Sequence, residues 1–281
     1  MASARIQRKL WRWYSRSYDG LLELVPYQRL LDTTAEALAC GPDDRLVDLG
    51  CGTGNLLARV AAGAGPWAWL VGVDSAASML AAARPKLVGT DRAELVESDL
   101  LEWLAAAPSD SFDRVVSVNV LYTLDAAQRA QFWADALRIL RPDGRLVVVT
   151  TDRAGFGPVL REHLQERSVL SSLRPRLLAV LGLNLAIWAL EARHVFDPAP
   201  VGELVGECRR AGGQVLRTER CYGGATDGVD VLLAVEPARV DVRPRSTATG
   251  MDGSGVDEAG VDEAGVPLAS SPPTLPTPTV G

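Results

Sequence analysis

Six residues of this chain, three glycines and three acids, have types and positions that could bind a ligand. They are Gly50, Gly52, Gly54, Asp48, Asp74 and Asp99. The glycines directly follow the predicted strand 45–49, and such a turn allows the backbone to approach a ligand closely at the edge of the sheet where α/β folds bind. The acids stand at or just after the ends of three predicted strands. Carboxylates placed there can accept hydrogen bonds from ribose hydroxyls.

The spacing of the glycines and the charge of the acids narrow the class of ligand. Dinucleotide-binding turns have the spacing G-x-G-x-x-G, because the N-terminus of the next helix must receive a pyrophosphate. Here the spacing is G-x-G-x-G, and Asp48 stands two residues before the first glycine. Three carboxylates at one crevice would repel a diphosphate and favour a ligand with an ammonium, a sulfonium and an adenosine group. Electrostatics therefore favours S-adenosylmethionine over NAD.

Alternating strands and helices must position these residues. The predicted strands are 45–49, 70–73, 94–97, 112–118, 145–151, 214–222 and 229–236. Helical patterns lie between them, and one of these helices begins with Asp125 as its cap and Gln128 three residues later. This alternation predicts an α/β fold, a Rossmann-like doubly wound sheet of seven strands that is mostly parallel. The last two runs are joined by the turn-rich segment 223–228, which predicts a hairpin with an antiparallel strand at one edge of the sheet.

Four segments resemble successive motifs of the class I S-adenosylmethionine-dependent methyltransferases, of the small-molecule type. They are Asp-Leu-Gly-Cys-Gly-Thr-Gly at 48–54, Gly-Val-Asp at 72–74, Ser-Asp at 98–99 and Leu-Arg-Pro-Asp-Gly-Arg-Leu at 140–146. The resemblance covers residues 44–151, which would form the cofactor-binding core, and extends loosely to the final hairpin. It implies an enzyme with S-adenosyl-L-methionine as its cofactor. The cofactor-binding residues that it implies are Asp48, Gly50, Gly52, Asp74, Ser75, Met79, Asp99, Leu100 and Asn119.

The resemblance also implies which part of the cofactor each residue contacts. Gly50 and Gly52 approach the methionine part, and Asn119 faces its amino acid moiety. Asp74 binds both ribose hydroxyls. Asp48 orients the glycine turn or the ammonium of the ligand.

At the adenine end, Met79 packs on the base, and Asp99 contacts its edge together with the amide of Leu100. Structural roles stay open at several of these positions. Asp74 and Asp99 could cap the helices that follow them, Met79 could be an ordinary core residue, and Gly54 could permit a helix to pack closely on a strand.

The residues that contact the methyl acceptor are predicted more loosely. The segment after the fourth predicted strand lacks the Asn/Asp-Pro-Pro-aromatic motif of methyltransferases that act on amino groups of nucleic-acid bases or glutamine. Tyr122 in this segment resembles an aromatic residue at the mouth of the pocket, and Tyr14 and Tyr18 are expected near it. His194 is a candidate base, although positioning of the reactants alone can supply much of the rate acceleration. His163 is expected on a solvated helix face.

Two additions to the sheet are expected to determine the acceptor. Residues 1–40 predict a helical lid, whose basic and apolar faces over 3–21 could instead contact an anionic membrane surface. Residues 158–192 predict an apolar helical cap between the fifth and sixth strands, which could be core, an oligomer interface or a wall of a lipophilic site. The acceptor is therefore expected to be small and hydrophobic or amphiphilic. The alternatives are a membrane lipid at the bilayer surface, or a cofactor-binding scaffold without catalysis.

Composition bounds the remaining questions. The chain has 281 residues, of which 47% are hydrophobic, and a net charge of −6, which argues against nucleic acid as a partner. Its four cysteines show no metal-ligand or disulfide spacing, and the longest apolar run, 177–190, is too short to span a bilayer. We therefore expect a cytoplasmic protein without a metal site. Residues 1–236 predict the methyltransferase domain, and 237–281 a disordered low-complexity tail.

Overall fold

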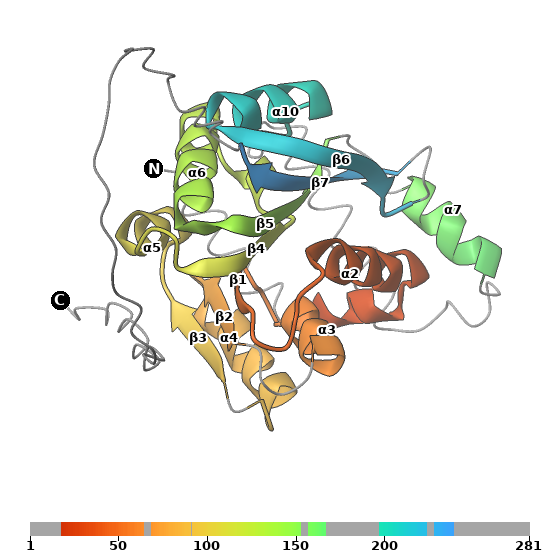
Figure 1. The fold of residues 1–281 in the computed structure, drawn as a ribbon. Helices are drawn as coiled ribbons and strands as arrows, with labels where there is room; N and C mark the ends of the chain where they lie inside the picture. Colours follow the sequence, from red (N-terminus) through yellow and green to blue (C-terminus); the bar gives the residue numbers. More distant parts are fainter. Residues whose placement is uncertain are drawn as a thin grey trace, which may run out of the picture. The chain divides into compact units, whose positions relative to one another are not determined.

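The computed structural model describes residues 18–64, 69–90, 92–152, 157–166, 197–223 and 228–238. The chain divides into two units, Met1–Ala238 and Arg239–Gly281, and all described residues belong to the first. That unit contains a sheet of seven strands in the order β3-β2-β1-β4-β5-β7-β6 (Figure 1). The strands are β1 (Arg45–Leu49), β2 (Trp69–Asp74), β3 (Ala93–Glu97), β4 (Phe112–Val118), β5 (Leu140–Thr151), β6 (Gly213–Cys221) and β7 (Asp230–Pro237).

The pairing of the strands confirms the predicted doubly wound sheet. β1, β2, β3, β4 and β5 pair in parallel, whereas β7 is antiparallel to both of its neighbours, β5 and β6. The predicted hairpin is therefore present at the edge of the sheet, with its second strand inserted between β5 and β6. Strand order reverses between β1 and β4, and ligands of such folds bind beyond the carboxyl ends of the strands at that reversal.

Helices cover both faces of this sheet. The described α-helices are α2 (Val25–Leu38), α3 (Asn55–Ala64), α4 (Ala77–Ala83), α5 (Leu100–Ala106), α6 (Ala126–Ile139), α7 (Gly157–Glu166) and α10 (Val201–Arg210). One face carries α2, α3 and α4, whose buried residues such as Leu30, Leu57 and Leu80 form a common core with Val116 and Val147 of the sheet. On the other face α6 packs against α5 and α10 (Figure 1).

The start of α6 is fixed by the capping interactions that the sequence predicts. The Asp125 carboxylate accepts a hydrogen bond from the Gln128 amide at 2.9 Å, and the Gln128 side chain accepts one from the Asp125 amide at 3.0 Å. Two N–H groups that a helix cannot satisfy internally are thus paired. This helix starts directly beyond the carboxyl end of β4 and the short 3-10 helix Leu121–Thr123.

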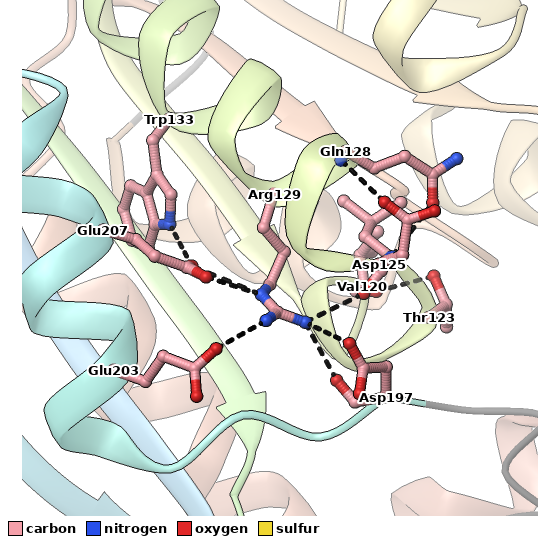
Figure 2. A network of polar contacts seen from close by, with 10 residues as sticks. Val120, Thr123, Asp125, Gln128, Arg129, Trp133, Asp197, Glu203 and Glu207 are labelled. Atoms are coloured by element: carbon pink, nitrogen blue, oxygen red, sulfur yellow. Dashed lines mark hydrogen bonds and ion pairs between the residues drawn. The ribbon is translucent and has the colours of Figure 1, made fainter.

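A buried arginine joins α6 to α10 (Figure 2). The Arg129 side chain is 2% exposed, and its Nε donates to both oxygens of Glu207 at 3.1 and 3.2 Å. The other two nitrogens donate to Asp197 at 2.8 Å and to Glu203 at 2.9 Å. Trp133 Nε1 donates to Glu207 at 3.2 Å. Because a buried charge is tolerated only when it is paired and hydrogen-bonded, this network fixes how the two helices pack.

The described part of the predicted lid is built from two helices. The 3-10 helix η1 (Asp19–Glu23) ends at Leu24, which is extended, and α2 begins at Val25 with Pro26 in its first turn. Tyr27 and Leu30 of α2 are 3% and 1% exposed. Residues 25–38 are therefore a fixed core helix. Residues 1–17 lie outside the described residues, so closure of a lid stays a prediction.

Two further predicted segments fall mostly outside the described residues. Of the predicted cap 158–192, the structure describes only the part within α7. Of the predicted tail, Pro237 belongs to β7, and the amide of Ala238 donates to the Gly212 carbonyl at 2.8 Å. The folded unit thus extends two residues past the predicted boundary at 236. None of the described helices is long and apolar enough to cross a membrane.

Candidate cofactor site

The glycine turn between β1 and α3 depends on backbone conformations that favour glycine. Gly50, Gly52 and Gly54 have φ values of +80°, +54° and +72°. A Cβ atom on Gly50 would lie 2.3 Å from Val120 Cγ2, and one on Gly54 would lie 2.9 Å from the Cβ of Ala83. Gly54 therefore permits the turn to pack closely on helix α4, whereas the alternative predicted from the sequence was close packing of a helix on a strand.

Gly52 differs from the other two glycines in its surroundings. A Cβ atom there would meet only the Tyr18 ring, at 4.0 Å, among the described residues. The turn itself is anchored to β2, because the amides of Gly50 and Cys51 both donate to the Val73 carbonyl, at 2.8 and 3.0 Å. The backbone at Gly52 is therefore held in place while the space beside it stays open enough for a ligand to approach.

Asp74 links the end of β2 to this turn. One carboxylate oxygen accepts the Gly52 amide at 2.9 Å, and the other accepts the amide of Ala76 at 2.8 Å. Burial raises the pKa of Asp74, and the two backbone hydrogen bonds oppose that shift. Each oxygen still has a lone pair for a further donor, so a diol can bind to the same carboxylate. The bond to Ala76 also orients the chain that enters α4.

Asp48 is the most deeply buried acid of the site. Its residue is 2% exposed, and no hydrogen bond to its carboxyl group was found among the described residues. Burial raises its pKa to about 8, and the charge of Asp74 adds to that shift. The carboxyl group is thus mostly protonated at neutral pH, and a positive charge bound nearby would favour its ionised form.

The residues expected at the adenine end have structural roles. Asp99 is exposed and caps α5, because its Oδ1 accepts the amides of Leu101 at 2.9 Å and Glu102 at 3.3 Å. The capping alternative is therefore confirmed, and Oδ2 is not used by these bonds. Met79 is 3% exposed and belongs to the core, which agrees with the alternative that it is an ordinary core residue. Leu100 is partly exposed at the start of α5, and Ser75 is exposed directly after β2.

Asn119, directly after β4, carries a polar atom without a partner. Its backbone has a φ of +56° and donates to the Val149 carbonyl at 2.8 Å. Its Oδ1 is buried, with no hydrogen-bond partner among the described residues. Buried carbonyl oxygens are rarely left unpaired, because desolvation then goes uncompensated. This oxygen is suited to accept a hydrogen bond from a ligand.

The predicted acceptor residues are partly described. Tyr18 meets the ring of Tyr27 edge to face at 6.3 Å, and Tyr27 meets that of Tyr222 at 6.4 Å. Tyr122 is 7% exposed and thus buried in this structure, and its place at the mouth of a pocket stays a prediction. Tyr14 and His194 lie outside the described residues.

The prediction for His163 is wrong. The residue is 2% exposed, because α7 packs against α2, and the amide of Val25 donates to its Nδ1 at 3.4 Å. Burial also raises the pKa of the Cys51 thiol well above its ordinary value, which suits the structural role predicted for this cysteine. No cluster of side chains that could hold a metal ion is found within the described residues.

One contributor to the site carries no sequence signal. Lys86, in the 3-10 helix η2 (Arg84–Leu87), donates from Nζ to Asp19, Thr53 and Asn55. Thr53 and Asn55 flank Gly54 at the end of the glycine turn, whereas Asp19 belongs to η1. These segments are far apart in sequence, so no spacing rule could have joined them.

Comparisons with known proteins agree with this geometry. A family described as a methyltransferase domain matches residues 46–144. The trans-aconitate 2-methyltransferase of Pseudomonas aeruginosa is 34% identical over 215 residues, which cover 66% of this chain and 72% of that protein. The ubiquinone/menaquinone biosynthesis C-methyltransferase of Geobacter sulfurreducens is 28% identical over 137 residues, 47% of this chain and 52% of that protein. The chain belongs to the class I S-adenosylmethionine-dependent methyltransferases.

A solved structure shares the fold. It is that of geranyl diphosphate C-methyltransferase from Streptomyces coelicolor A3(2), in complex with Mg²⁺, geranyl diphosphate and S-adenosyl-L-homocysteine. The two structures superpose with a TM-score of 0.53 at 14% sequence identity, and the match covers 75% of this chain and 79% of that one. S-adenosylmethionine is the cofactor of the family. The chain spans about half of the length of the quinone-biosynthesis relative.

Proposed function

We propose that this protein transfers a methyl group from S-adenosylmethionine to a small hydrophobic or amphiphilic acceptor. The observation that carries the proposal is the Asp74 carboxylate, which binds the Gly52 amide and so places an acid and an open glycine backbone side by side. An acid in that position suits a ligand with ribose hydroxyls, and the G-x-G-x-G spacing of the adjoining turn favours a ligand without a pyrophosphate.

Three parts of the site fit the cofactor. Asp74 would accept hydrogen bonds from the ribose hydroxyls, and the unpaired Oδ1 of Asn119 would accept a hydrogen bond from the ammonium group. Asp48 would supply a negative charge on the same side of the glycine turn. The cofactor brings an electrophilic methyl group on a sulfonium, so the protein's main task is to hold an acceptor in line with it and to exclude water. His194 stays a prediction as a base.

The proposed acceptor class rests on the apolar surroundings of the site. Tyr18, Tyr27 and Tyr222 form a continuous run of aromatic rings that begins beside Gly52. Aromatic rings contribute large apolar contact areas, which suit a flat or greasy acceptor better than a highly charged one. One relative is named for quinone biosynthesis and the other for trans-aconitate, a polycarboxylate. The run of tyrosines favours the apolar kind of acceptor.

Calorimetry on the wild-type protein tests the cofactor. S-adenosylhomocysteine should bind and NAD should not. Asp74→Ala should weaken binding at least tenfold, because a group that accepts charged or multiple hydrogen bonds from a ligand is worth roughly 1.5–3 kcal/mol. Asp113→Ala is the matched control: Asp113 also accepts a backbone amide, that of Arg45 at 2.9 Å, but it lies at the amino end of β4. Equal loss in both variants would refute the role of Asp74.

Methyl transfer from labelled cofactor tests the acceptor. A short-chain quinol and trans-aconitate should be offered separately, with the labelled product identified. We expect label in the quinol. Label in trans-aconitate alone would refute an apolar acceptor, and tight NAD binding without S-adenosylhomocysteine binding would refute the proposed activity.

A further inference from the structure

Lys86 is shared between the glycine turn and the N-terminal 3-10 helix η1. Its ammonium donates to Asn55 Oδ1 at 2.6 Å and to the Thr53 carbonyl at 2.9 Å, both at the end of the turn. It also donates to Asp19 Oδ1 at 2.7 Å. An ammonium has three protons, so these bonds use its full donor capacity. The side chain is 22% exposed, and the bond to Asp19 is therefore partly shielded from solvent.

Asp19 is joined to the turn a second time. Its Oδ1 also accepts the Thr53 hydroxyl at 2.7 Å. The preceding residue, Tyr18, places its ring 4.0 Å from the position that a Cβ atom on Gly52 would occupy. Asp19 thus holds η1 on the turn at the point where the backbone of Gly52 is open, and Tyr18 becomes a wall of that opening.

Lys86 also orients Asn55, which is 7% exposed. With Oδ1 bound to Lys86, the amide nitrogen of Asn55 points to the Tyr27 hydroxyl, to which it donates at 3.4 Å. Tyr27 in turn packs against Tyr18. The same lysine therefore fixes two sides of the opening, one through Asp19 and one through Asn55 and Tyr27.

We propose that Lys86 is a positioning residue of the cofactor site, which seats residues 18–23 on the glycine turn and thereby slows release of the cofactor. This inference rests on the proposed function. Lys86 does not touch the cofactor in this proposal. It acts through Asp19 and Asn55, and its loss frees the wall formed by Tyr18 without altering Asp74 or Asn119.

The test is the rate at which S-adenosylhomocysteine leaves the full-length protein, measured by stopped-flow displacement with tryptophan fluorescence. Lys86→Met should increase that rate roughly tenfold, the order expected when a charge-assisted hydrogen bond is lost. Arg84→Met is the matched control, because it removes an exposed cation from the same short helix, and no bond from the Arg84 side chain to another described residue was found. Its dissociation rate should equal that of the wild type.

A second variant removes the other side of the contact. Asp19→Asn should also accelerate dissociation, and the double variant Lys86→Met/Asp19→Asn should be faster by less than the two single effects combined, because both changes weaken the contact between Lys86 and Asp19. Additive effects would overturn the inference. Because the Asp19 side chain is 43% exposed, we expect Asp19→Asn to keep the fold, so this variant still tests the inference if Lys86→Met does not fold. Lys86→Arg should restore part of the slow release.

Hydrogen exchange separates this inference from the proposed function. Amides of residues 19–23 should exchange faster in Lys86→Met than in Arg84→Met, with or without ligand. Unchanged release and unchanged exchange, in a protein whose wild type binds S-adenosylhomocysteine, would overturn the role of Lys86 alone. Absence of any S-adenosylhomocysteine binding by the wild type would overturn the proposed function, and the exchange comparison would still test whether Lys86 seats η1.

Discussion

Removing Arg129 should destabilise the protein strongly, because its partner Glu207 is also buried. Arg129→Met deletes the Nε bonds to Glu207, whose side chain is 6% exposed, and leaves that carboxylate with Trp133 as its remaining partner among the bonds found (Figure 2). Breaking a buried ion pair by removing one member typically costs about 3–5 kcal/mol. For a domain of this size that corresponds to a fall in Tm of roughly 6–20 °C.

The three acids of this network should contribute unequally. The side chains of Asp197 and Glu203 are 62% and 47% exposed, so Asp197→Asn and Glu203→Gln should each cost no more than about 1 kcal/mol. Glu207→Gln should cost about 1–3 kcal/mol, because a buried bond to a charged group is weakened. The double variant Arg129→Met/Glu207→Leu should recover much of the loss of Arg129→Met, since apolar side chains often replace a buried ion pair at little cost.

Urea denaturation of each variant, followed by circular dichroism, measures these free energies of unfolding. Equal effects of Glu203→Gln and Glu207→Gln would refute the reasoning, because burial would then not determine the cost. So would a loss of less than 1 kcal/mol for Arg129→Met. The double variant serves as the internal control: if it is less stable than either single variant, the two residues do not act as a pair.

Two further changes test the geometry around the glycine turn. Gly50→Ala should lower the free energy of unfolding by roughly 2 kcal/mol or more, because Gly50 has a φ of +80° and the new Cβ would lie 2.3 Å from Val120 Cγ2. Gly63→Ala, in α3 with no atom within 4 Å of the new Cβ, should raise that free energy by up to about 1 kcal/mol. Urea titrations in which the two changes had the same sign would contradict this prediction. Burial raises the pKa of Asp48 to about 8, so the folded state binds this proton more tightly than the unfolded state. The resulting stability is present in full below about pH 4 and is lost as the pH rises through 8. The stability of the wild type relative to Asp48→Asn should therefore fall between pH 5 and 8, and parallel urea midpoints across that range would show that Asp48 does not hold its proton.

The strands could be predicted from the sequence because each is a short apolar run that alternates with a helical pattern. β1 and β4 begin and end at the predicted residues. β2, β3, β6 and β7 each differ from the prediction by one residue at one or both ends, whereas β5 begins at Leu140 rather than at residue 145. Its first residues include Pro142 and Gly144, which weaken a strand, and so the pattern gave no sign of pairing there. Leu140 nevertheless pairs with Phe112 of β4.

Side-chain environments were harder to predict than strands, because they depend on which element packs where. His163 lies between charged residues in the sequence, which is typical of a solvated helix face, but α7 packs against α2 and buries it. The resemblance places Met79 and Asp99 at the adenine, and in the structure the first is also part of the core and the second caps α5, so their contact with the adenine stays a prediction. A motif fixes where such a residue lies along the chain and leaves open which partner its side chain contacts.

The charges of the site show why tertiary structure is needed to understand the motifs. Lys86 lies beside the glycine turn, so from opposite charge alone it would be expected to pair with Asp48 or Asp74. In the structure its ammonium is bound to Asp19 instead. Among the described residues no ion pair involves Asp48 or Asp74. The ammonium near the turn is therefore already paired, while the carboxyl groups of Asp48 and Asp74 have no basic partner among the described residues. A cation bound there would favour the ionised form of Asp48, which is mostly protonated without it, so these acids favour a sulfonium cofactor over a phosphate-bearing one.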